Sequence, residues 1–223
     1  MQKFEKRLVE LDNFMSIQKA CNYALENSKM IAVFGYEGAG KTIALRKFYK
    51  ENRNTQFIKV RKSMTTMNFY SELLGTQSIS NRGYKSLYGI MNRLRSINYG
   101  NEKRLLIIDE VGKFKFSDLE YLHEFRDLTE ESLGIILAGP EYFHDDLLFG
   151  VRNKVKGIPE FYRRINFKIW LDRPKKKEIT AICNTYEITD KKLINNRFCK
   201  NENFASLSDD IESFLMYERE DSF

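Results

Sequence analysis

The sequence predicts an α/β protein with a five-stranded, mostly parallel sheet, helices on both faces, and a small helical subdomain at the C-terminal end. Three observations support this fold class. Five short apolar runs alternate with stretches of helical periodicity, as in a parallel sheet covered on both sides. A glycine-rich turn directly follows the first run. After Pro174 only helical periodicity continues, so we expect two parts, residues 1–173 and 174–223.

The first part is predicted to begin with an amphipathic helix at residues 14–27 and to contain all five strands. The strands are the apolar runs at residues 30–34, 56–60, 105–109, 134–138 and 167–171. A helix should follow the glycines to about Lys50, and residues 62–99 should form two helices that break near "SISNRG". In the second part we expect helices at residues 175–186 and 204–217, with an acidic tail.

Composition excludes several classes of protein. With 42% hydrophobic and 13% aromatic residues, the chain can build a core, which argues against a disordered protein. No apolar run approaches the ~20 residues that span a bilayer. The start, "MQKFEKRLVE", lacks a signal peptide's apolar stretch, so we expect a cytoplasmic protein without a membrane partner. The widely spaced cysteines favour a reducing compartment over a disulfide framework or a metal site.

Charge is distributed unevenly along the chain. The last 23 residues carry seven acidic residues against one arginine, and the remainder holds 36 basic and 24 acidic residues, a net charge of +12. Residues 51–104 and 152–177 are basic blocks, whereas residues 105–150 carry three basic and eleven acidic residues. Such blocks are often only solvated faces. The functional interpretation is a surface attracted to a polyanion, with an acidic face that could meet a basic face on a neighbouring copy.

The turn after the first strand matches the phosphate-binding pattern G-x-x-x-x-G-K-[ST]. It reads Gly35-Tyr36-Glu37-Gly38-Ala39-Gly40-Lys41-Thr42. Glycines permit the positive φ angles with which backbone N–H groups surround a phosphate, and the following helix contributes the positive end of its dipole. We expect Lys41 to reach the β- and γ-phosphates and Thr42 to bind Mg²⁺. The pattern therefore predicts a nucleoside triphosphate site.

The third strand completes this site in "RLLIIDEVGKF". Four apolar residues bring Asp109 to a strand end, where its carboxylate can hold the water shell of Mg²⁺. Glu110 follows directly and is placed to polarise a water for attack on the γ-phosphate. The alternative is an acidic strand end without a function. An Asp-Glu pair favours hydrolysis coupled to a mechanical change over phosphoryl transfer to a small acceptor.

Two arginines precede the fifth strand, in "PEFYRRINFKIWL". In an oligomeric ATPase the edge that carries Arg163 and Arg164 faces the nucleotide of the next subunit. A guanidinium there can offset the charge that develops on the γ-phosphate. The alternative interpretation is an ordinary basic patch.

The phosphate loop, "LLIIDE", "SDLEYLHEFRDLTEESLGIILAGPEYF", "FYRRI" and the small helical lid together resemble an AAA+ ATPase, a type of P-loop NTPase. More narrowly, they resemble the target-capture ATPases of transposable elements, the Mu B, TnsC and IstB group, over roughly residues 14–217. The resemblance implies ATP and Mg²⁺ as ligands and sequence-nonspecific binding to double-stranded DNA. It also implies assembly into a helical filament or ring and recruitment of a transposase, in a bacterial or phage-encoded protein.

Carried over by position, the resemblance assigns nucleotide binding to residues 35–42 and Asp109, and Mg²⁺ to Thr42 and Asp109. It makes Glu110 the catalytic base and Arg164 the arginine finger, with Arg163 as the alternative. The chain departs from the family pattern at two positions. It has Ala138-Gly139-Pro140 where a polar sensor is common, and residues 203–207 contain no arginine where the lid often supplies one. Both departures predict slow turnover.

DNA contact is expected from the ATPase domain itself, because we expect no N-terminal helix-turn-helix domain. The candidates are Lys62, which leaves a strand end in "VRKSMTT", and Arg82 and Lys85 in the glycine-containing "SNRGYK". Cations on such loops can contact the DNA backbone without reading base edges. The alternative is a scatter of solubilising charges.

Three other functions remain open on the sequence. An AAA+ helicase loader shares the fold and the site. A P-loop nucleoside or nucleotide kinase suits the length, but it would need an arginine-rich lid and an acidic substrate-binding residue near the first helix. A scaffold that binds ATP without hydrolysing it would switch only with nucleotide occupancy.

Overall fold

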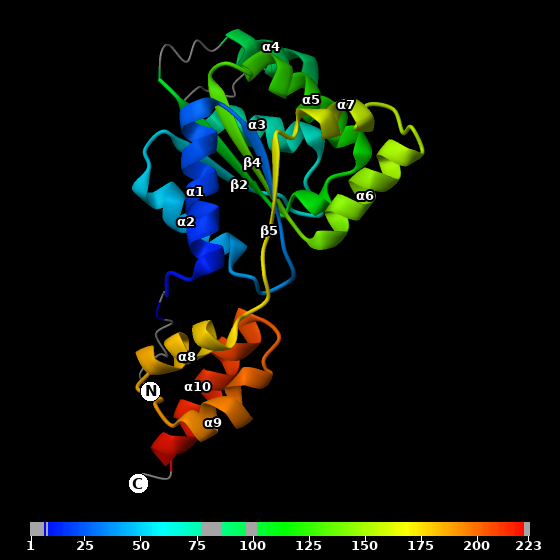
Figure 1. Ribbon diagram of the computed structural model, residues 1–223. Coiled ribbons are helices and arrows are strands. Elements are labelled where there is room, and N and C mark those ends of the chain that lie inside the picture. The colour runs from blue at the N-terminus through cyan, green and yellow to red at the C-terminus, as the bar shows by residue number, and fades with distance from the viewer. Residues whose placement is uncertain (1–6, 8, 77–85, 97–101, 221–223) are drawn as a thin grey trace.

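The computed structural model describes residues 7, 9–76, 86–96 and 102–220 and contains one five-stranded parallel sheet within them (Figure 1). The strand order is β2-β3-β4-β1-β5, and all four neighbouring pairs run parallel. The strands are β1 (Met30–Phe34), β2 (Thr55–Lys59), β3 (Arg104–Asp109), β4 (Leu133–Gly139) and β5 (Phe167–Trp170). The five predicted strands are thus confirmed, each within one residue at either end.

Helices cover both faces of the sheet, and the strand residues alternate between two apolar clusters. On one face, α1 (Asp12–Asn27) and α2 (Lys41–Glu51) pack against Ile31, Val33 and Ile107. On the other face, the strand side chains include Ala32, Ile108 and Leu137. This second face is covered by α3 (Thr66–Thr76), α4 (Leu87–Ser96), α5 (Phe116–Thr129), α6 (Glu141–Arg152) and α7 (Ile158–Arg164). Burial on both faces explains why the central strands read as continuous apolar runs.

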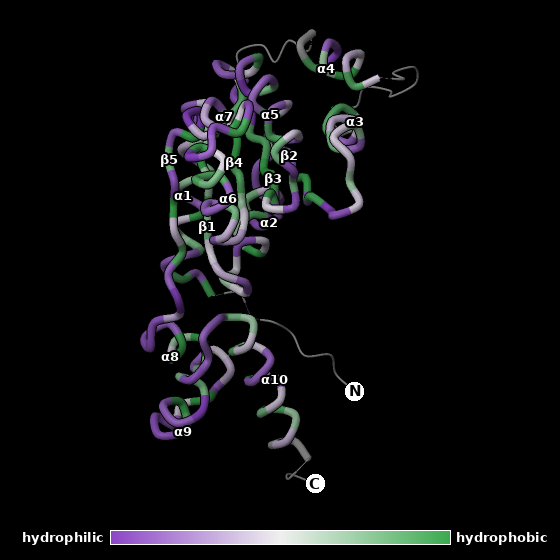
Figure 2. Tube along the Cα trace, turned by 90° about the vertical axis from the view of Figure 1, so that its right-hand side faces the viewer, coloured by the Kyte–Doolittle hydropathy of each residue, from purple (hydrophilic) through white to green (hydrophobic). Residues whose placement is uncertain are grey.

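The two helices predicted within residues 62–99 are confirmed as α3 and α4. The break predicted between them, "SISNRG", lies at residues 78–83, outside the described residues. A short 3₁₀ turn, η1 (Val111–Lys113), follows β3 and precedes α5. Figure 2 shows the apolar strands at the centre, with more polar helix surfaces around them.

The residues after Pro174 form a third apolar cluster below the sheet. It is built by α8 (Lys176–Thr185), α9 (Lys191–Asn196), η2 (Phe198–Lys200) and α10 (Phe204–Glu220). The helix α10, predicted at residues 204–217, contributes Leu207 and Ile211, both fully buried. The short helix α9 was not predicted, because six residues carry too little periodicity. The division at residues 173 and 174 stays a prediction. We call residues 176–217 the lid.

The start of α1 is tied to the segment that joins β5 to α8. The Asn13 amide donates to the backbone oxygen of Asp172 at 2.7 Å and accepts from its N–H at 3.1 Å. Glu178, buried at the start of α8, accepts from the backbone N–H groups of Lys175 and Asp12. These bonds fix the N-terminal segment beside the lid. Among the described residues, no helix combines the length and apolarity that crossing a bilayer requires.

Candidate nucleotide-binding site

The phosphate loop joins β1 to α2 and has the backbone geometry that its glycines predict. Gly38 has a φ of 79° and Gly40 a φ of 83°, a region that L side chains rarely adopt. A Cβ on Gly38 would also lie 2.7 Å from Oδ1 of Asn203, whereas the space around Gly40 is open. Gly38 is therefore required by both conformation and close packing, and Gly40 by conformation alone. The Glu37 side chain is exposed, which leaves the loop's backbone free to face a phosphate.

Lys41 is folded back onto its own loop. Its Nζ donates to the backbone oxygens of Gly35 at 2.5 Å and Tyr36 at 2.9 Å. Burial lowers the pKa of this ammonium, and the nearby carboxylates of Asp109 and Glu110 oppose that shift. The hydrogen bonds of this partly desolvated ammonium go only to neutral carbonyls. A bound anion would therefore stabilise it strongly. The loop residues therefore fit a phosphate ligand.

Thr42 and Asp109 are brought together from positions 67 residues apart. The Thr42 hydroxyl donates to Oδ2 of Asp109 at 2.8 Å, and the N–H of Glu110 donates to Oδ1 at 3.0 Å. Asp109 is 1% exposed, and burial raises the pKa of its carboxyl against the effect of the Thr42 bond. A hydroxyl and a buried carboxylate are the hard oxygen donors that Mg²⁺ prefers. These residues therefore fit a magnesium ion bound beside the loop.

Glu110 leaves the strand end in a left-handed conformation, with a φ of 62°. One carboxylate oxygen lies 3.3 Å from Nζ of Lys113, and the other lies 3.8 Å from Nζ of Lys59. A non-glycine residue in this region is uncommon and frequently marks a functional site. Neither lysine was predicted from the sequence, because a single lysine at a strand end or in a turn carries no specific signal.

The two candidate finger arginines lie at the end of α7 in different environments. Arg164 is held within the chain, with NH2 2.8 Å from Asp127 and NH1 4.0 Å from Glu130 on or beside α5. Arg163 is exposed and has no hydrogen bond or ion pair with the described residues. Of these two arginines, Arg163 is therefore the one whose guanidinium has no partner among the described residues.

Ion pairs within the chain connect the basic block at residues 152–177 with the acidic block at residues 105–150. Lys156, from the basic block at residues 152–177, lies 3.3 Å from Glu120, and Arg164 pairs with Asp127 in the acidic block. Part of the attraction between the acidic and basic blocks is therefore satisfied within one chain. An encounter between these blocks on two copies stays a prediction.

Of the three candidate DNA residues, only Lys62 lies in the described part of the chain. It is exposed, lies three residues after the end of β2 at Lys59, and is next to Arg61, which is also exposed. Arg82 and Lys85 fall within residues 77–85, outside the described residues.

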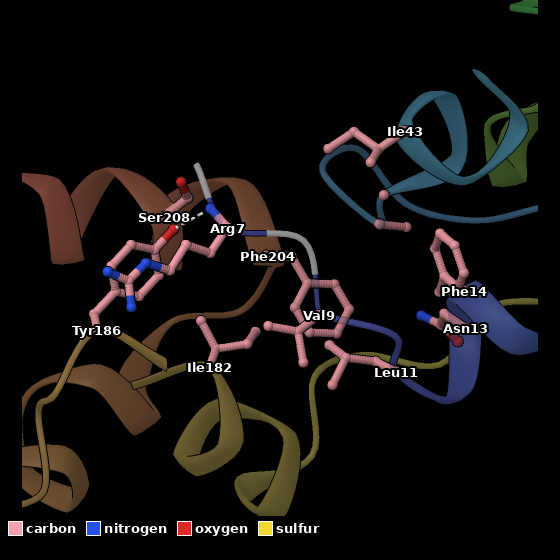
Figure 3. Close-up of a pocket in the computed structure, with 12 residues that line it drawn as sticks. Arg7, Val9, Leu11, Asn13, Phe14, Ile43, Ile182, Tyr186, Phe204 and Ser208 are labelled. Atoms are coloured by element: carbon pink, nitrogen blue, oxygen red, sulfur yellow. Dashed lines mark hydrogen bonds between the residues drawn. The ribbon is translucent and has the colours of Figure 1, made fainter. Parts of the chain in front are cut away.

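A pocket lies between the phosphate loop, the N-terminal segment and the lid (Figure 3). Its lining is mostly apolar and comes from residues far apart in the sequence: Arg7, Val9, Leu11, Asn13, Phe14, Ala39, Gly40, Ile43, Ile182, Tyr186, Phe204 and Ser208. At one side, the backbone N–H of Arg7 donates to the Tyr186 hydroxyl at 2.8 Å. A concave, apolar site next to a phosphate loop fits the flat ring of a nucleobase. The sequence did not predict it, because no local pattern links the segments that form it.

Comparison with known proteins agrees with this fold. The family model described as "AAA domain" matches residues 24–147. The "ATP-dependent target DNA activator B" of Escherichia phage Mu is 24% identical over 188 residues, which cover 83% of this chain and 58% of that protein. The protein of the same description from Escherichia phage D108 is 24% identical over 184 residues, 82% of this chain and 57% of that protein. The chain thus spans less than three fifths of the length of these two relatives.

Solved structures share the fold. The Aeropyrum pernix ORC1 protein in complex with DNA superposes with a TM-score of 0.65 at 12% identity, covering 96% of this chain and 62% of that one. The Walker-type ATPase of Pyrococcus abyssi gives a TM-score of 0.60 at 17% identity, covering 99% of this chain and 78% of that one. The predicted fold class, an AAA+ type P-loop NTPase, is confirmed, and so is the predicted similarity to the Mu B group.

Proposed function

The chain belongs to the AAA domain family, and on that basis we propose that it is an ATP-dependent, sequence-nonspecific DNA-binding ATPase that assists transposition. It binds ATP with Mg²⁺, assembles on duplex DNA as a filament or ring, and recruits or activates a transposase. Hydrolysis is slow and is stimulated by DNA and by assembly.

One observation carries the nucleotide part of this proposal. The Thr42 hydroxyl of the phosphate loop meets the Asp109 carboxylate of β3 at 2.8 Å, with Lys41 and Glu110 adjacent in sequence to each. A loop that binds phosphates, a pair of Mg²⁺ ligands and a candidate base are thereby gathered at the carboxyl ends of β1 and β3. Residues 35–42 and Asp109 bind the nucleotide and its metal, and Glu110 acts on the attacking water.

The DNA and transposase parts rest on the relatives and on charge. The two phage proteins similar to this chain over more than four fifths of its length are described as activators of target DNA. The exposed cations Arg61 and Lys62 lie shortly after the end of β2, in the basic block where the sequence predicts backbone contacts. Lys62, Arg82 and Lys85 are the proposed DNA residues.

Steady-state ATP hydrolysis with and without duplex DNA tests the proposal, together with electron microscopy of the protein on DNA with a slowly hydrolysed ATP analogue. We expect assembly only when both ligands are present and a higher rate of hydrolysis on DNA. Hydrolysis unaffected by DNA, with no assembly at low salt, would contradict the DNA part.

The alternatives give different outcomes. A helicase loader would capture a replicative helicase in a pulldown, whereas the proposed protein captures a transposase. A nucleoside or nucleotide kinase would transfer phosphate to an added nucleoside or nucleotide. A non-hydrolysing switch would assemble with ATP and release no phosphate.

A further inference from the structure

Tyr36, the second residue of the phosphate loop, contacts an arginine from outside the loop. The Cζ of Arg173 lies 5.1 Å from the centre of the Tyr36 ring, a cation–π geometry. Tyr36 is 7% exposed, and its hydroxyl has no hydrogen-bond partner among the described residues. The loop therefore presents a buried aromatic ring, with one unsatisfied polar atom, to the segment between β5 and α8.

Arg173 also contacts the lid. Its NH1 group donates to the backbone oxygen of Glu202 at 3.4 Å and lies 3.8 Å from the Glu202 carboxylate. The lid approaches the same loop a second time, because a Cβ added to Gly38 would lie 2.7 Å from Oδ1 of Asn203 and 2.9 Å from Cβ of Ala205, at the start of α10. Asn203 in turn caps that helix through the N–H of Ser206 at 2.8 Å. The start of α10 is thus held to the phosphate loop by Arg173 and by Gly38.

The loop residue that Arg173 contacts also accepts a hydrogen bond from Lys41. Nζ of Lys41 donates a hydrogen bond to the Tyr36 backbone oxygen at 2.9 Å. To serve a phosphate, this ammonium must weaken its bonds to the loop carbonyls, so the Tyr36 peptide loses a charged donor. Tyr36 therefore combines a backbone oxygen that Lys41 bonds with a ring that lies under the Arg173 guanidinium.

We propose that Arg173 is a positioning residue that couples the phosphate loop, through Tyr36, to the lid, through Glu202. The proposal rests on the proposed function, in that it assumes ATP as the ligand of the loop. Residues 203–207 contain no arginine. Arg173 supplies a cation at the boundary between loop and lid from the segment that joins them.

The test compares Arg173→Ala and Arg173→Lys with Tyr36→Phe and Tyr36→Leu. ATP affinity is measured by calorimetry, and lid position is followed by the fluorescence of Trp170, the chain's one tryptophan. Trp170 is a suitable reporter because it lies three residues before Arg173 and is 49% exposed. The centre of its ring lies 4.7 Å from that of the His144 ring. Arg53→Ala is the matched control, since Arg53 is an exposed arginine between α2 and β2.

Arg173→Ala and Tyr36→Leu should each weaken ATP binding about 3- to 10-fold, the range expected for loss of one cation–π contact. Both should also reduce the ATP-dependent change in Trp170 fluorescence by at least about half. The double variant should be no weaker than either single variant, because both remove the same contact. Tyr36→Phe keeps the ring and should retain more of the ATP affinity and of the Trp170 response than Tyr36→Leu, and Arg173→Lys should restore part of the signal.

Two results separate this inference from the proposed function. A wild-type protein without measurable ATP binding would overturn both. A wild-type protein that binds ATP, with Arg173→Ala equal to it in affinity and in Trp170 response, would overturn the coupling alone. An effect of Arg53→Ala as large as that of Arg173→Ala would also overturn it, since general loss of positive charge would then explain the result.

Discussion

Nζ of Lys113 lies 3.3 Å from a carboxylate oxygen of Glu110, the residue that we propose as the catalytic base. Lys59 approaches the other oxygen at 3.8 Å from the end of β2. The Glu110 and Lys113 side chains are more than a third exposed, so each pair contributes about 0–1 kcal/mol and is readily exchanged for other partners. The carboxylate is therefore oriented without being locked, which suits its proposed role of accepting a proton.

Glu110→Gln should bind ATP with wild-type affinity and hydrolyse it at least about 100-fold more slowly. The amide preserves the shape of the side chain but cannot accept a proton from water. Calorimetry and phosphate release measure the two properties separately. Loss of binding equal to the loss of turnover would show that Glu110 holds the nucleotide and does not act as base.

Lys41→Ala should abolish measurable ATP binding. Its ammonium is the charged donor placed on the phosphate loop, where it now bonds Gly35 and Tyr36. Lys47→Ala is the matched control, because Lys47 lies on the same helix and pairs with Glu51 at the surface. Binding by Lys41→Ala within threefold of the control would refute the assigned role.

Asp109→Asn should stabilise the protein without Mg²⁺ while removing its Mg²⁺-dependent ATP hydrolysis. Burial raises the pKa of Asp109, so the folded chain binds this proton more tightly than the unfolded chain does. Stability is therefore lost as pH rises from the ordinary value of 3.8 through the raised pKa, and the cost is complete at neutral pH. We expect a Tm increase of about 1–4 °C at pH 7, corresponding to ~1 kcal/mol. A fall in Tm at pH 7, measured by calorimetry, would contradict this sign.

Much of the fold was predictable because the central strands are buried on both faces. An apolar run such as "LLIID" has one stable position in a parallel sheet, so the strand limits and Asp109 at the strand end followed from the sequence. The phosphate loop was equally predictable, because its positive φ angles require glycine at positions such as Gly38 and Gly40.

The remaining features depend on contacts between distant segments. The pocket between the phosphate loop, the N-terminal segment and the lid is lined by Val9, Ile43 and Phe204, which share no spacing or motif. Ion pairing of Arg164 with Asp127 depends on how α5 and α7 pack, and the sequence order of the two arginines carries no information about it. The contact between Arg173 and Tyr36 likewise becomes visible only when β5 has been placed beside β1.

Arg163→Ala and Arg164→Ala should bind ATP normally and differ in hydrolysis. We expect the larger loss, at least about 10-fold, for Arg163→Ala, since Arg164 would first have to leave Asp127 and Glu130. Arg164→Ala should instead lower stability, by about 1 kcal/mol for a partly exposed pair. Chemical denaturation and phosphate release distinguish the two effects, and the reverse pattern would assign the finger to Arg164.

Mixing each arginine variant with Lys41→Ala tests whether the finger acts between subunits. A subunit with an intact finger then faces a neighbour with an intact phosphate loop, so hydrolysis should partly return. Mixed oligomers must be demonstrated independently, for example by co-purification of two tags. Absence of rescue at every mixing ratio would place the arginine's action within its own subunit.

The positive charge of the chain predicts how it binds DNA. A chain with a net charge of +12 outside its last 23 residues should bind duplex DNA through phosphates, with little sequence preference. Affinity should fall by about 0.9 log units per log unit of salt for each phosphate neutralised. Binding should require ATP, because only an assembled oligomer aligns many weak sites. Replacing Lys62, Arg82 and Lys85 by alanine should weaken binding equally on unrelated sequences and reduce the salt slope.

The matched control replaces three exposed lysines of the lid, Lys191, Lys192 and Lys200, and so removes the same net charge from another surface. Filter binding across a salt series compares the two triple variants, and hydrolysis without DNA checks that each is folded. If the lid variant loses as much affinity as the first, net charge and not a defined surface explains binding. A wild-type protein that shows no ATP-dependent DNA retention at low salt would overturn the transposition proposal and favour a kinase or a nucleotide switch.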